Sequence, residues 1–473
     1  MTIETRTEPL AAVLVAVQLP GVSDEEFEGS VAELERLVHT LGHPVVGRVT
    51  QKRSALGASA VLGEGKLAEL AEWTGGSGKV PSTAPEKRDK ARIKREGDSE
   101  GGGDDEIEAF EDEESDEDAG EGSRPVASGK RVKAGIVVVD HEITPSQARN
   151  LERATGADVR DRTGVIVEIF HRHAHSREAK LQVEIARLTY LAPRMREAGG
   201  GGDRQRGGIG GKGAGESALE LDRRKIRDRI AELRNELAAI QKTQETRRAR
   251  RKDALRVALV GYTNAGKSSL MRALTASEVL VADKLFATLD TTVRALQPET
   301  RPRILVSDTV GFIKKLPHDL VASFKSTLDE ALEAALLLYV VDASDPTFRS
   351  QLEVTRSVLG EIGATSSPSY LLLNKIDRVG AEQREALRAE FPDAIQLSAK
   401  TTDDVRMLRD TIAKFFERDM VEEDLFLPYG REKHLGEIHD RLRVLDEQYD
   451  EQGARFRVKG NADEIARIRA LIG

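Results

Sequence analysis

The sequence has no cysteine and no long apolar run. Without a thiol among its 473 residues, the chain can form neither disulfides nor thiolate metal sites. The longest apolar stretches, such as residues 336–341, are far too short to cross a bilayer. The first ten residues, MTIETRTEPL, lack a basic stretch followed by an apolar core, so we expect no secretory signal. A monomeric cytoplasmic protein without a membrane span is the simplest interpretation.

The net charge of −9 is concentrated in one segment. Residues 100–122 hold 13 acidic residues and no basic one, so the rest of the chain carries a charge of about +4. A mildly basic remainder permits contact with nucleic acid without establishing it.

The chain is long enough for three or four domains, and its first part predicts an α/β domain over residues 1–173. Apolar strand-like runs alternate there with helical patterns such as residues 24–41. The expected strands are residues 11–19, 45–49, 136–139 and 165–170. Residues 75–131 are first rich in Gly, Ser and Pro, then basic, then acidic, which predicts a disordered insertion.

Two apolar stripes with coiled-coil spacing predict an antiparallel helical hairpin over residues 174–252. They consist of Leu181, Ile185, Leu188, Ala192 and Met195, and of Ile226, Ile230, Leu233, Leu237 and Ile240. The glycine-rich segment between them, residues 199–216, predicts a mobile loop. Its Arg204, Arg206 and Lys212 could contact phosphates, or the loop could be a linker without a role. The basic run at residues 247–252 is either a solvated face or part of a nucleic-acid surface.

A phosphate-binding loop follows, in the context that it requires. The apolar strand at residues 256–260 runs directly into GYTNAGKSS, residues 261–269, and then into a helix. The glycines let backbone N–H groups curl around a β-phosphate, Lys267 supplies a cation, and Ser268 offers a hydroxyl to Mg²⁺. The predicted contacts are Gly261, Tyr262, Thr263, Asn264, Ala265, Gly266, Lys267 and Ser268.

Two further segments complete the predicted phosphate and magnesium site. After the strand at residues 304–306 comes DTVG, in which Asp308 can hold a magnesium-bound water and the Gly311 N–H can sense a γ-phosphate. FATLD, residues 286–290, is the expected first switch, with Thr288 as the second protein ligand of Mg²⁺. Thr291 and Thr292 compete for that role. The expected contacts are Phe286, Ala287, Thr288, Leu289, Asp290, Asp308, Thr309, Val310 and Gly311.

Guanine specificity is predicted by two motifs that follow strands. A carboxylate at Asp377 would accept hydrogen bonds from guanine N1 and N2 and repel adenine N1, and the Ala399 N–H would reach guanine O6. The contacts expected are Asn374, Lys375, Ile376, Asp377, Ser398, Ala399 and Lys400. These elements favour a GTPase, with a G domain over residues 254–418, over a kinase or a generic ATPase.

The position after Gly311 predicts slow hydrolysis. It holds Phe312, where Ras-type GTPases place the glutamine that orients the attacking water. Alternatively, Phe312 packs in the core. We expect Lys267, Asn264 and Gly311 to act in catalysis, with Asn264 able to hold a potassium ion against the phosphates.

Several motifs together resemble the HflX family of translation-associated GTPases, which is related to Era and Obg. They are VQLPG (17–21), GEGKLAEL (63–70), EAKLQVEIA (178–186), GGIGGKGAGE (207–216), LFATLD (285–290) and DTVGFIKKLPHDLVASFKSTLDE (308–330). The resemblance implies an N-terminal α/β domain with a helical hairpin, a G domain and a small C-terminal α/β domain at residues 419–473. It also implies GTP and GDP as ligands, and binding to the 50S subunit and its rRNA with splitting or rescue of stalled ribosomes.

Some features leave alternatives open. GEGK at Gly63 to Lys66 could form an ATP site, because the family is reported to use ATP, although the segment lacks a full phosphate loop. His171, His173 and His175 would share one face, as in a metal site, if they lay along a strand, but exposed histidines at a strand-to-helix junction are a sufficient explanation. Ala214 stands where the family's loop usually has proline. A GTP-dependent rRNA- or tRNA-processing factor and a GTP-regulated RNA-binding scaffold are the alternative functions.

Overall fold

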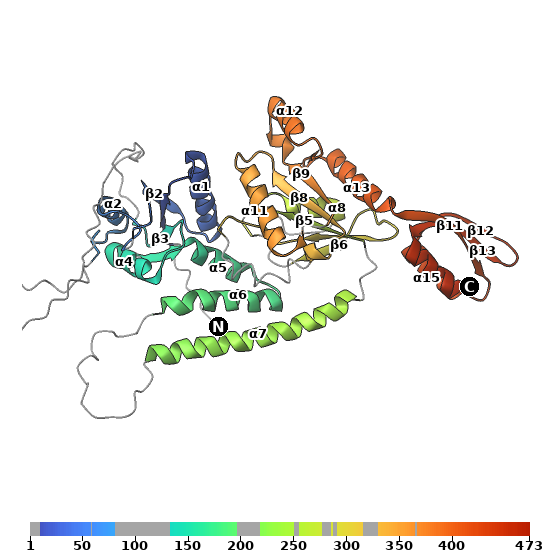
Figure 1. Ribbon diagram of the computed structural model, residues 1–473, viewed down its shortest axis with the longest axis horizontal. Coiled ribbons are helices and arrows are strands. Elements are labelled where there is room, and N and C mark those ends of the chain that lie inside the picture. Colours follow the sequence, from blue (N-terminus) through green and yellow to red (C-terminus); the bar gives the residue numbers. More distant parts are fainter. Residues whose placement is uncertain are drawn as a thin grey trace, which may run out of the picture.

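The computed structural model describes residues 10–57, 59–80, 133–195, 218–249, 255–276, 285–286, 291–315, 330–364 and 367–473. Its elements form four units along the chain (Figure 1). They are an N-terminal domain, a helical hairpin, a G domain and a C-terminal domain. This confirms the predicted multidomain α/β class. The limits of the units, placed at 173, 252–254 and 418 from the sequence, stay a proposal.

The N-terminal domain is a parallel sheet with helices on both faces. The strand order is β2-β1-β3-β4. Side chains alternate along β1, so that Leu14 packs with α1 and α5 while Val13 and Val15 pack with α2 and α4. Its elements are β1 (Ala12–Gln18), α1 (Asp24–Thr40), β2 (Val45–Lys52), α2 (Glu64–Thr74), β3 (Ile136–Val139), α4 (Pro145–Thr155), β4 (Asp158–Asp161) and α5 (Arg162–His173).

One predicted strand was wrong. Residues 165–170 lie in α5, and the fourth strand is the shorter and more polar β4. The Asp161 side chain caps α5 by accepting the Gly164 N–H at 2.8 Å. Because α5 is buried on most sides, its apolar residues run together and resemble a buried strand.

The same correction removes the basis for a histidine metal site. His171 and His173 end a helix, so alternate residues do not share a face. Within the described residues, no group of three or more His, Asp or Glu side chains could hold a metal ion.

The helical hairpin consists of two helices of very different length that pack antiparallel (Figure 1). They are α6 (Arg177–Leu191), followed by η1 (Ala192–Arg194), and α7 (Ala218–Ala249). Leu181 and Ile185 of α6 pack against Leu233 of α7, as the coiled-coil stripes predict. Arg177 of α6 and Glu236 of α7 form an ion pair across the contact. The glycine-rich segment 199–216 lies outside the described residues, as does most of the insertion at 75–131.

The G domain is a six-stranded sheet of order β10-β9-β8-β5-β7-β6, in which only the β6–β7 pairing is antiparallel. Its apolar core lies between the sheet and its helices. The elements are β5 (Leu255–Gly261), α8 (Lys267–Thr275), β6 (Thr292–Ala295), β7 (Ile304–Asp308), β8 (Leu336–Asp342), α11 (Phe348–Glu361), β9 (Ser369–Asn374), η3 (Ile376–Arg378), α12 (Ala381–Glu390), β10 (Ile395–Gln396) and α13 (Thr402–Glu417).

The C-terminal domain is a three-stranded antiparallel sheet of order β11-β13-β12, with helices covering one face (Figure 1). The Arg301 guanidinium of the G domain donates to the His439 carbonyl at 2.7 Å and to Asp440 Oδ1 at 2.8 Å. The elements are β11 (Met420–Pro428), η4 (Glu432–His434), α14 (Leu435–Arg441), β12 (Arg443–Tyr449), β13 (Gly453–Asn461) and α15 (Ala462–Ile472). None of the helices in the described part of the chain is long and apolar enough to span a membrane.

Candidate functional site

The loop between β5 and α8 has the geometry of a phosphate cradle. Gly261 has φ 152° and Gly266 has φ 98°, both in a region that favours glycine. A Cβ atom on Gly261 would collide with the Val340 carbonyl oxygen, and one on Gly266 with Asn374 Nδ2. The chain therefore needs glycine at both positions to bring the loop against the neighbouring strands.

Lys267, the first residue of α8, is held inside this loop. Its Nζ donates to the Tyr262 carbonyl oxygen at 2.8 Å and to the Gly261 carbonyl oxygen at 3.1 Å. The side chain is buried, and burial lowers the pKa of Lys267 to about 8. Two carbonyl oxygens thus fix the ammonium group beside the N-terminus of α8, where phosphate oxygens bind favourably.

Two residues of the predicted magnesium site come together where α8 begins and β7 ends. Ser268 Oγ donates to Asp308 Oδ2 at 2.6 Å, because the parallel pairing of β5 with β7 places the end of β7 beside the loop. Hydroxyl and carboxylate oxygens are the hard ligands that suit Mg²⁺. Ser268 would bind the ion directly and Asp308 through water, and the ion would neutralise charge on the β- and γ-phosphates. Thr288, the predicted third contributor, lies outside the described residues together with Ala287, Leu289 and Asp290.

The segment after Asp308 lies directly against the phosphate loop. A Cβ atom on Gly311 would lie 2.9 Å from Thr263 Cα and 3.0 Å from Lys267 Nζ, so only glycine fits without displacement. The Phe312 N–H donates to the Gly261 carbonyl at 3.1 Å, and the Phe312 carbonyl accepts the Thr263 N–H at 2.8 Å. The structure therefore brings Gly311 and Lys267 together, as the sequence predicts.

The Phe312 side chain packs in the core and is 3% exposed. It has no polar atom and no access to the site, so it cannot orient a water molecule. The structure therefore agrees with the alternative that Phe312 packs in the core.

The motifs predicted to read guanine also hold the phosphate loop in place. Asn374 Nδ2 donates to the Ala265 carbonyl at 2.8 Å, and Asn374 Oδ1 accepts the Ala399 N–H at 3.2 Å. Lys375 has φ 58°, and its Nζ donates to the Asn264 carbonyl at 2.7 Å. The two segments that were predicted to bind the base and the phosphates are thus one connected structure.

Asp377 is prepared to accept hydrogen bonds. Ser398 Oγ donates to Asp377 Oδ1 at 2.7 Å, and Lys400 Nζ lies 3.9 Å from Oδ2. The Ser398 hydrogen bond lowers the pKa of Asp377, so the carboxylate is ionised at neutral pH. An ionised carboxylate can accept from both guanine N1 and N2, which agrees with the predicted role.

Sequence reasoning missed several contacts around the nucleotide site. Asp342 at the end of β8 accepts from Lys375 Nζ at 2.7 Å. Phe286 of the predicted first switch packs edge-on against Phe170 of α5, with ring centroids 4.6 Å apart. Lys315 forms a 2.9 Å ion pair with Asp140 of the N-terminal domain. No motif marks these contacts, because their partners are distant in sequence.

The GEGK segment of the N-terminal domain does not form a phosphate loop. Gly63 is the N-cap residue of α2, and its N–H donates to Gln51 Oε1 at 2.9 Å. Lys66 Nζ pairs with Glu69 at 2.8 Å.

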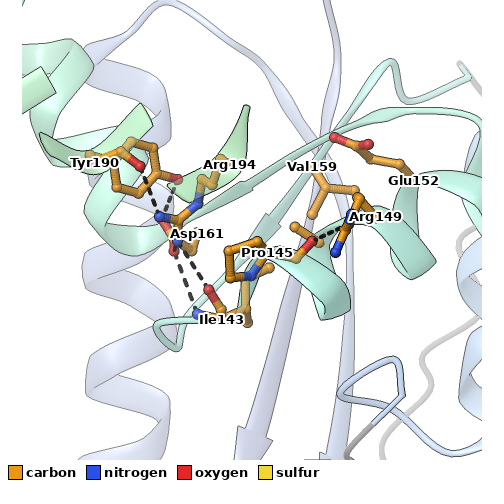
Figure 2. Close-up of a pocket in the computed structure, with 9 residues that line it drawn as sticks. Ile143, Pro145, Arg149, Glu152, Val159, Asp161, Tyr190 and Arg194 are labelled. Atoms are coloured by element: carbon orange, nitrogen blue, oxygen red, sulfur yellow. Dashed lines mark hydrogen bonds and ion pairs between the residues drawn. The ribbon is translucent and has the colours of Figure 1, made fainter. Parts of the chain in front are cut away.

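A cavity between the N-terminal domain and the helical hairpin has about 50 Å³, well below the roughly 300 Å³ of a small-molecule site. Figure 2 shows that its polar groups face one another: Tyr190 donates to Asp161 at 2.7 Å, and Arg194 pairs with the same carboxylate at 2.7 Å. ATP binding by this domain stays a prediction.

Three family models match the chain. A model described as "GTP-binding GTPase N-terminal" matches residues 28–79 and 124–171, one described as "GTP-binding GTPase Middle Region" matches residues 173–251, and one described as "50S ribosome-binding GTPase" matches residues 256–375.

The chain is also similar to curated and solved proteins. It is 61% identical over 466 residues to a protein of Gluconacetobacter diazotrophicus named GTPase HflX, covering 98% of each chain. It is 40% identical to the Escherichia coli GTPase HflX, covering 68% of this chain and 76% of that one. Among solved structures, a Sulfolobus solfataricus GTP-binding protein in complex with GDP has a TM-score of 0.40 at 22% identity, over 86% of this chain and 98% of that one. Because relatives named GTPase HflX are 61% and 34% identical to it over 98% of its length, the chain belongs to the HflX family of GTPases.

Proposed function

We propose that this GTPase binds the 50S ribosomal subunit and couples GTP binding and hydrolysis to the splitting or rescue of stalled ribosomes. The observation that carries the proposal is the helical hairpin. With 32 residues, α7 is about 48 Å long, roughly twice the length of the 15-residue α6 beside it. Its long reach suits a probe that enters a recess of a large ribonucleoprotein.

The proposed binding to the 50S subunit rests on the family match and on the basic residues between α6 and α7. The model that matches residues 256–375 is described as a 50S ribosome-binding GTPase. The segment between α6 and α7 lies outside the described residues, and its sequence offers Arg204, Arg206 and Lys212 to phosphates. A ribosome-directed GTPase of this kind would act in the cytoplasm as a monomer.

Hydrolysis requires help from a partner. Lys267 and Gly311 lie close together at the phosphate loop, which supports a role in stabilising charge on the γ-phosphate, but buried Phe312 supplies nothing to orient water. We therefore expect slow basal turnover that 50S subunits accelerate.

We propose that a potassium ion bound at Asn264 supplies additional positive charge to the phosphates during hydrolysis. The residue is exposed at the tip of the loop with φ 60°. Hydrolysis by metal-free protein supplied with Mg²⁺ should be severalfold faster in K⁺ than in Na⁺, and the difference should vanish in Asn264→Ala. Equal rates in the two salts would remove Asn264 from catalysis.

The alternatives are a GTP-dependent rRNA- or tRNA-processing factor and a GTP-regulated RNA-binding scaffold. A processing factor of the Era type would carry a KH module with a GXXG loop, and residues 419–473 contain no GXXG sequence. A scaffold would bind GTP without acceleration by 50S subunits.

Co-sedimentation with purified 50S subunits, in GDP and in a non-hydrolysable GTP analogue, tests the proposal. We expect tighter binding with the analogue, and faster GTP hydrolysis when subunits are added. Replacing residues 203–213 by a short Gly/Ser turn should weaken 50S binding while sparing basal hydrolysis and the melting temperature.

A matched charge variant distinguishes the hairpin from the C-terminal domain. Arg455 and Arg457 are exposed on β13, where they pair with Asp450 and Asp424. The Arg455→Gln/Arg457→Gln double variant should bind 50S subunits like the parent. If it loses binding while the loop variant keeps it, the C-terminal domain docks and the role of the hairpin is wrong.

A further inference from the structure

A buried ionic cluster lies between the N-terminal domain and the G domain. Arg162, the first residue of α5, is 1% exposed and donates to Asp140 Oδ1 at 2.7 Å and to the Glu33 carboxylate. Glu33 and Asp140 are also buried. One guanidinium thus holds two carboxylates of the N-terminal domain, and none of the three enters the GTPase motifs.

This cluster extends to the segment that follows Gly311. Lys315 Nζ donates to Asp140 Oδ2 at 2.9 Å and to the Asp140 carbonyl at 3.1 Å. Lys314 Nζ pairs with Glu26 of α1 at 2.9 Å. Two consecutive lysines of the γ-phosphate-sensing segment are therefore anchored on the N-terminal domain.

Tyr262 of the phosphate loop connects the same groups through one hydroxyl. The side chain is 3% exposed, and its hydroxyl oxygen accepts the Lys314 N–H at 2.7 Å. The hydroxyl is also hydrogen-bonded to Glu33, and burial together with this carboxylate raises the pKa of Tyr262 well above its ordinary value. It therefore stays protonated, accepting from Lys314 and donating to Glu33.

The main chain of Tyr262 links this hydroxyl to the catalytic group. Its carbonyl oxygen accepts Lys267 Nζ at 2.8 Å, and Tyr262 pairs with Phe312 in a short parallel bridge. Around it, Phe286, Phe312 and Phe170 belong to one apolar core shared by both domains. A shift of the Tyr262 ring would therefore move both the lysine cage and the segment carrying Gly311.

We infer that Tyr262 is a positioning residue for GTP hydrolysis, whose hydroxyl fixes the phosphate loop and the segment after Gly311 to Glu33 of the N-terminal domain. The N-terminal domain thereby sets the geometry of Lys267 and Gly311. Without the hydroxyl, the Lys314 N–H has no acceptor at this place, and a partly buried donor left without a partner is unfavourable. The segment then relaxes away from its position against Lys267.

Tyr262→Phe isolates the hydroxyl, because the ring still fills the shared core. We expect kcat to fall about tenfold while KM changes less than about twofold. A tenfold decrease in rate corresponds to roughly the net free energy that one hydrogen bond contributes. Tyr370→Phe is the matched control: its hydroxyl makes no hydrogen bond within the described part of the chain, and it packs against Phe415 on another side of the G domain. The control should keep the parental kcat.

Lys315 provides a second variant that does not touch the phosphate loop. Its side chain is 45% exposed, so substitution should be tolerated in folding. Lys315→Met removes the ion pair with Asp140 and should lower kcat, whereas Lys315→Arg keeps the charge and should restore it. If the contact between Lys315 and Asp140 were purely structural, its loss would change the melting temperature without lowering kcat at a nearly constant KM. Parental kcat in Tyr262→Phe, or equal loss in the methionine and arginine variants, would overturn the inference.

Discussion

Two loops of this protein place glycine and lysine at the start of a helix, and only one of the two has the backbone geometry of a phosphate loop. In the loop at 261–269, Gly266 has φ 98° and Lys267 is held by two backbone carbonyls. In the segment at 63–66, Gly63 has φ −71° and Lys66 pairs with the neighbouring Glu69. The difference lies in backbone conformation rather than composition, because Gly266 adopts a positive φ and Gly63 does not.

The largest expected contrast comes from removing each lysine. Lys267→Ala should lower GTP hydrolysis by about 10²- to 10³-fold or more, since it deletes a preorganised cation at the γ-phosphate. Lys66→Ala should leave steady-state GTP hydrolysis unchanged. A comparable loss in both variants would show that the N-terminal loop takes part in GTP turnover.

The glycines provide a second contrast. Gly266→Ala places a Cβ atom against Asn374 in a left-handed conformation, and should lower GTP affinity by at least tenfold through a distorted loop. Gly63→Ala meets the flexible Gln51 Nε2 at 3.1 Å in an ordinary conformation and should be tolerated. Equilibrium binding of a fluorescent GTP analogue measures both. Equal affinities in the two variants would contradict the role given to Gly266.

A third test concerns the selectivity of the G domain for the base. Asp377→Asn should weaken GTP binding by about 10- to 100-fold, because a paired hydrogen bond to a base contributes roughly 1–3 kcal/mol. It should also increase binding of xanthosine triphosphate, whose N1 and O2 pattern the amide complements. Any ATP turnover that survives this substitution would belong to a site outside the G domain. An unchanged GTP preference would refute the assignment of Asp377.

The smallest expected effect is a pH dependence of GTP affinity. Burial lowers the pKa of Lys267 from 10.5 to about 8 in the nucleotide-free protein. Between those values the unfolded chain binds more protons than the folded one, so this group makes stability rise with pH in that window. Bound phosphates would raise the pKa again. GTP affinity should therefore decrease above about pH 8, by up to tenfold per pH unit. Lys267→Arg, which stays charged, should show a flatter dependence when both are titrated by calorimetry, and equal slopes would contradict the assignment.

The linear motifs made most of the nucleotide site predictable. Gly261 to Ser268, Asp308 to Gly311 and Asn374 to Asp377 each follow a strand, and parallel pairing brings the strand ends to one edge of the sheet. The order of these motifs and their positions after strands were therefore enough to predict that they meet in one site. Thr288 stays a prediction.

Tertiary contacts were not predictable in the same way. Glu33 and Arg162 interact with Tyr262, and Asp140 pairs with Arg162, yet these three residues come from separate segments of another domain. Nothing in the local pattern of any of them indicates a partner in the phosphate loop. The misassigned strand at 165–170 has a related cause, because a helix buried on both sides loses the alternation that would identify it.

The unequal lengths of α6 and α7 also have a mechanical consequence. Only five residues separate the end of α7 at Ala249 from the start of β5 at Leu255, the strand that leads into the phosphate loop. A rotation of α7 by about 10° around that end would displace its far end by roughly 8 Å, given a helix of about 48 Å. That displacement exceeds the spacing between two β-strands, about 4.8 Å. A small rotation at the base of α7 would thus be magnified, as by a lever arm, into a displacement of several ångströms at the other end of the helix.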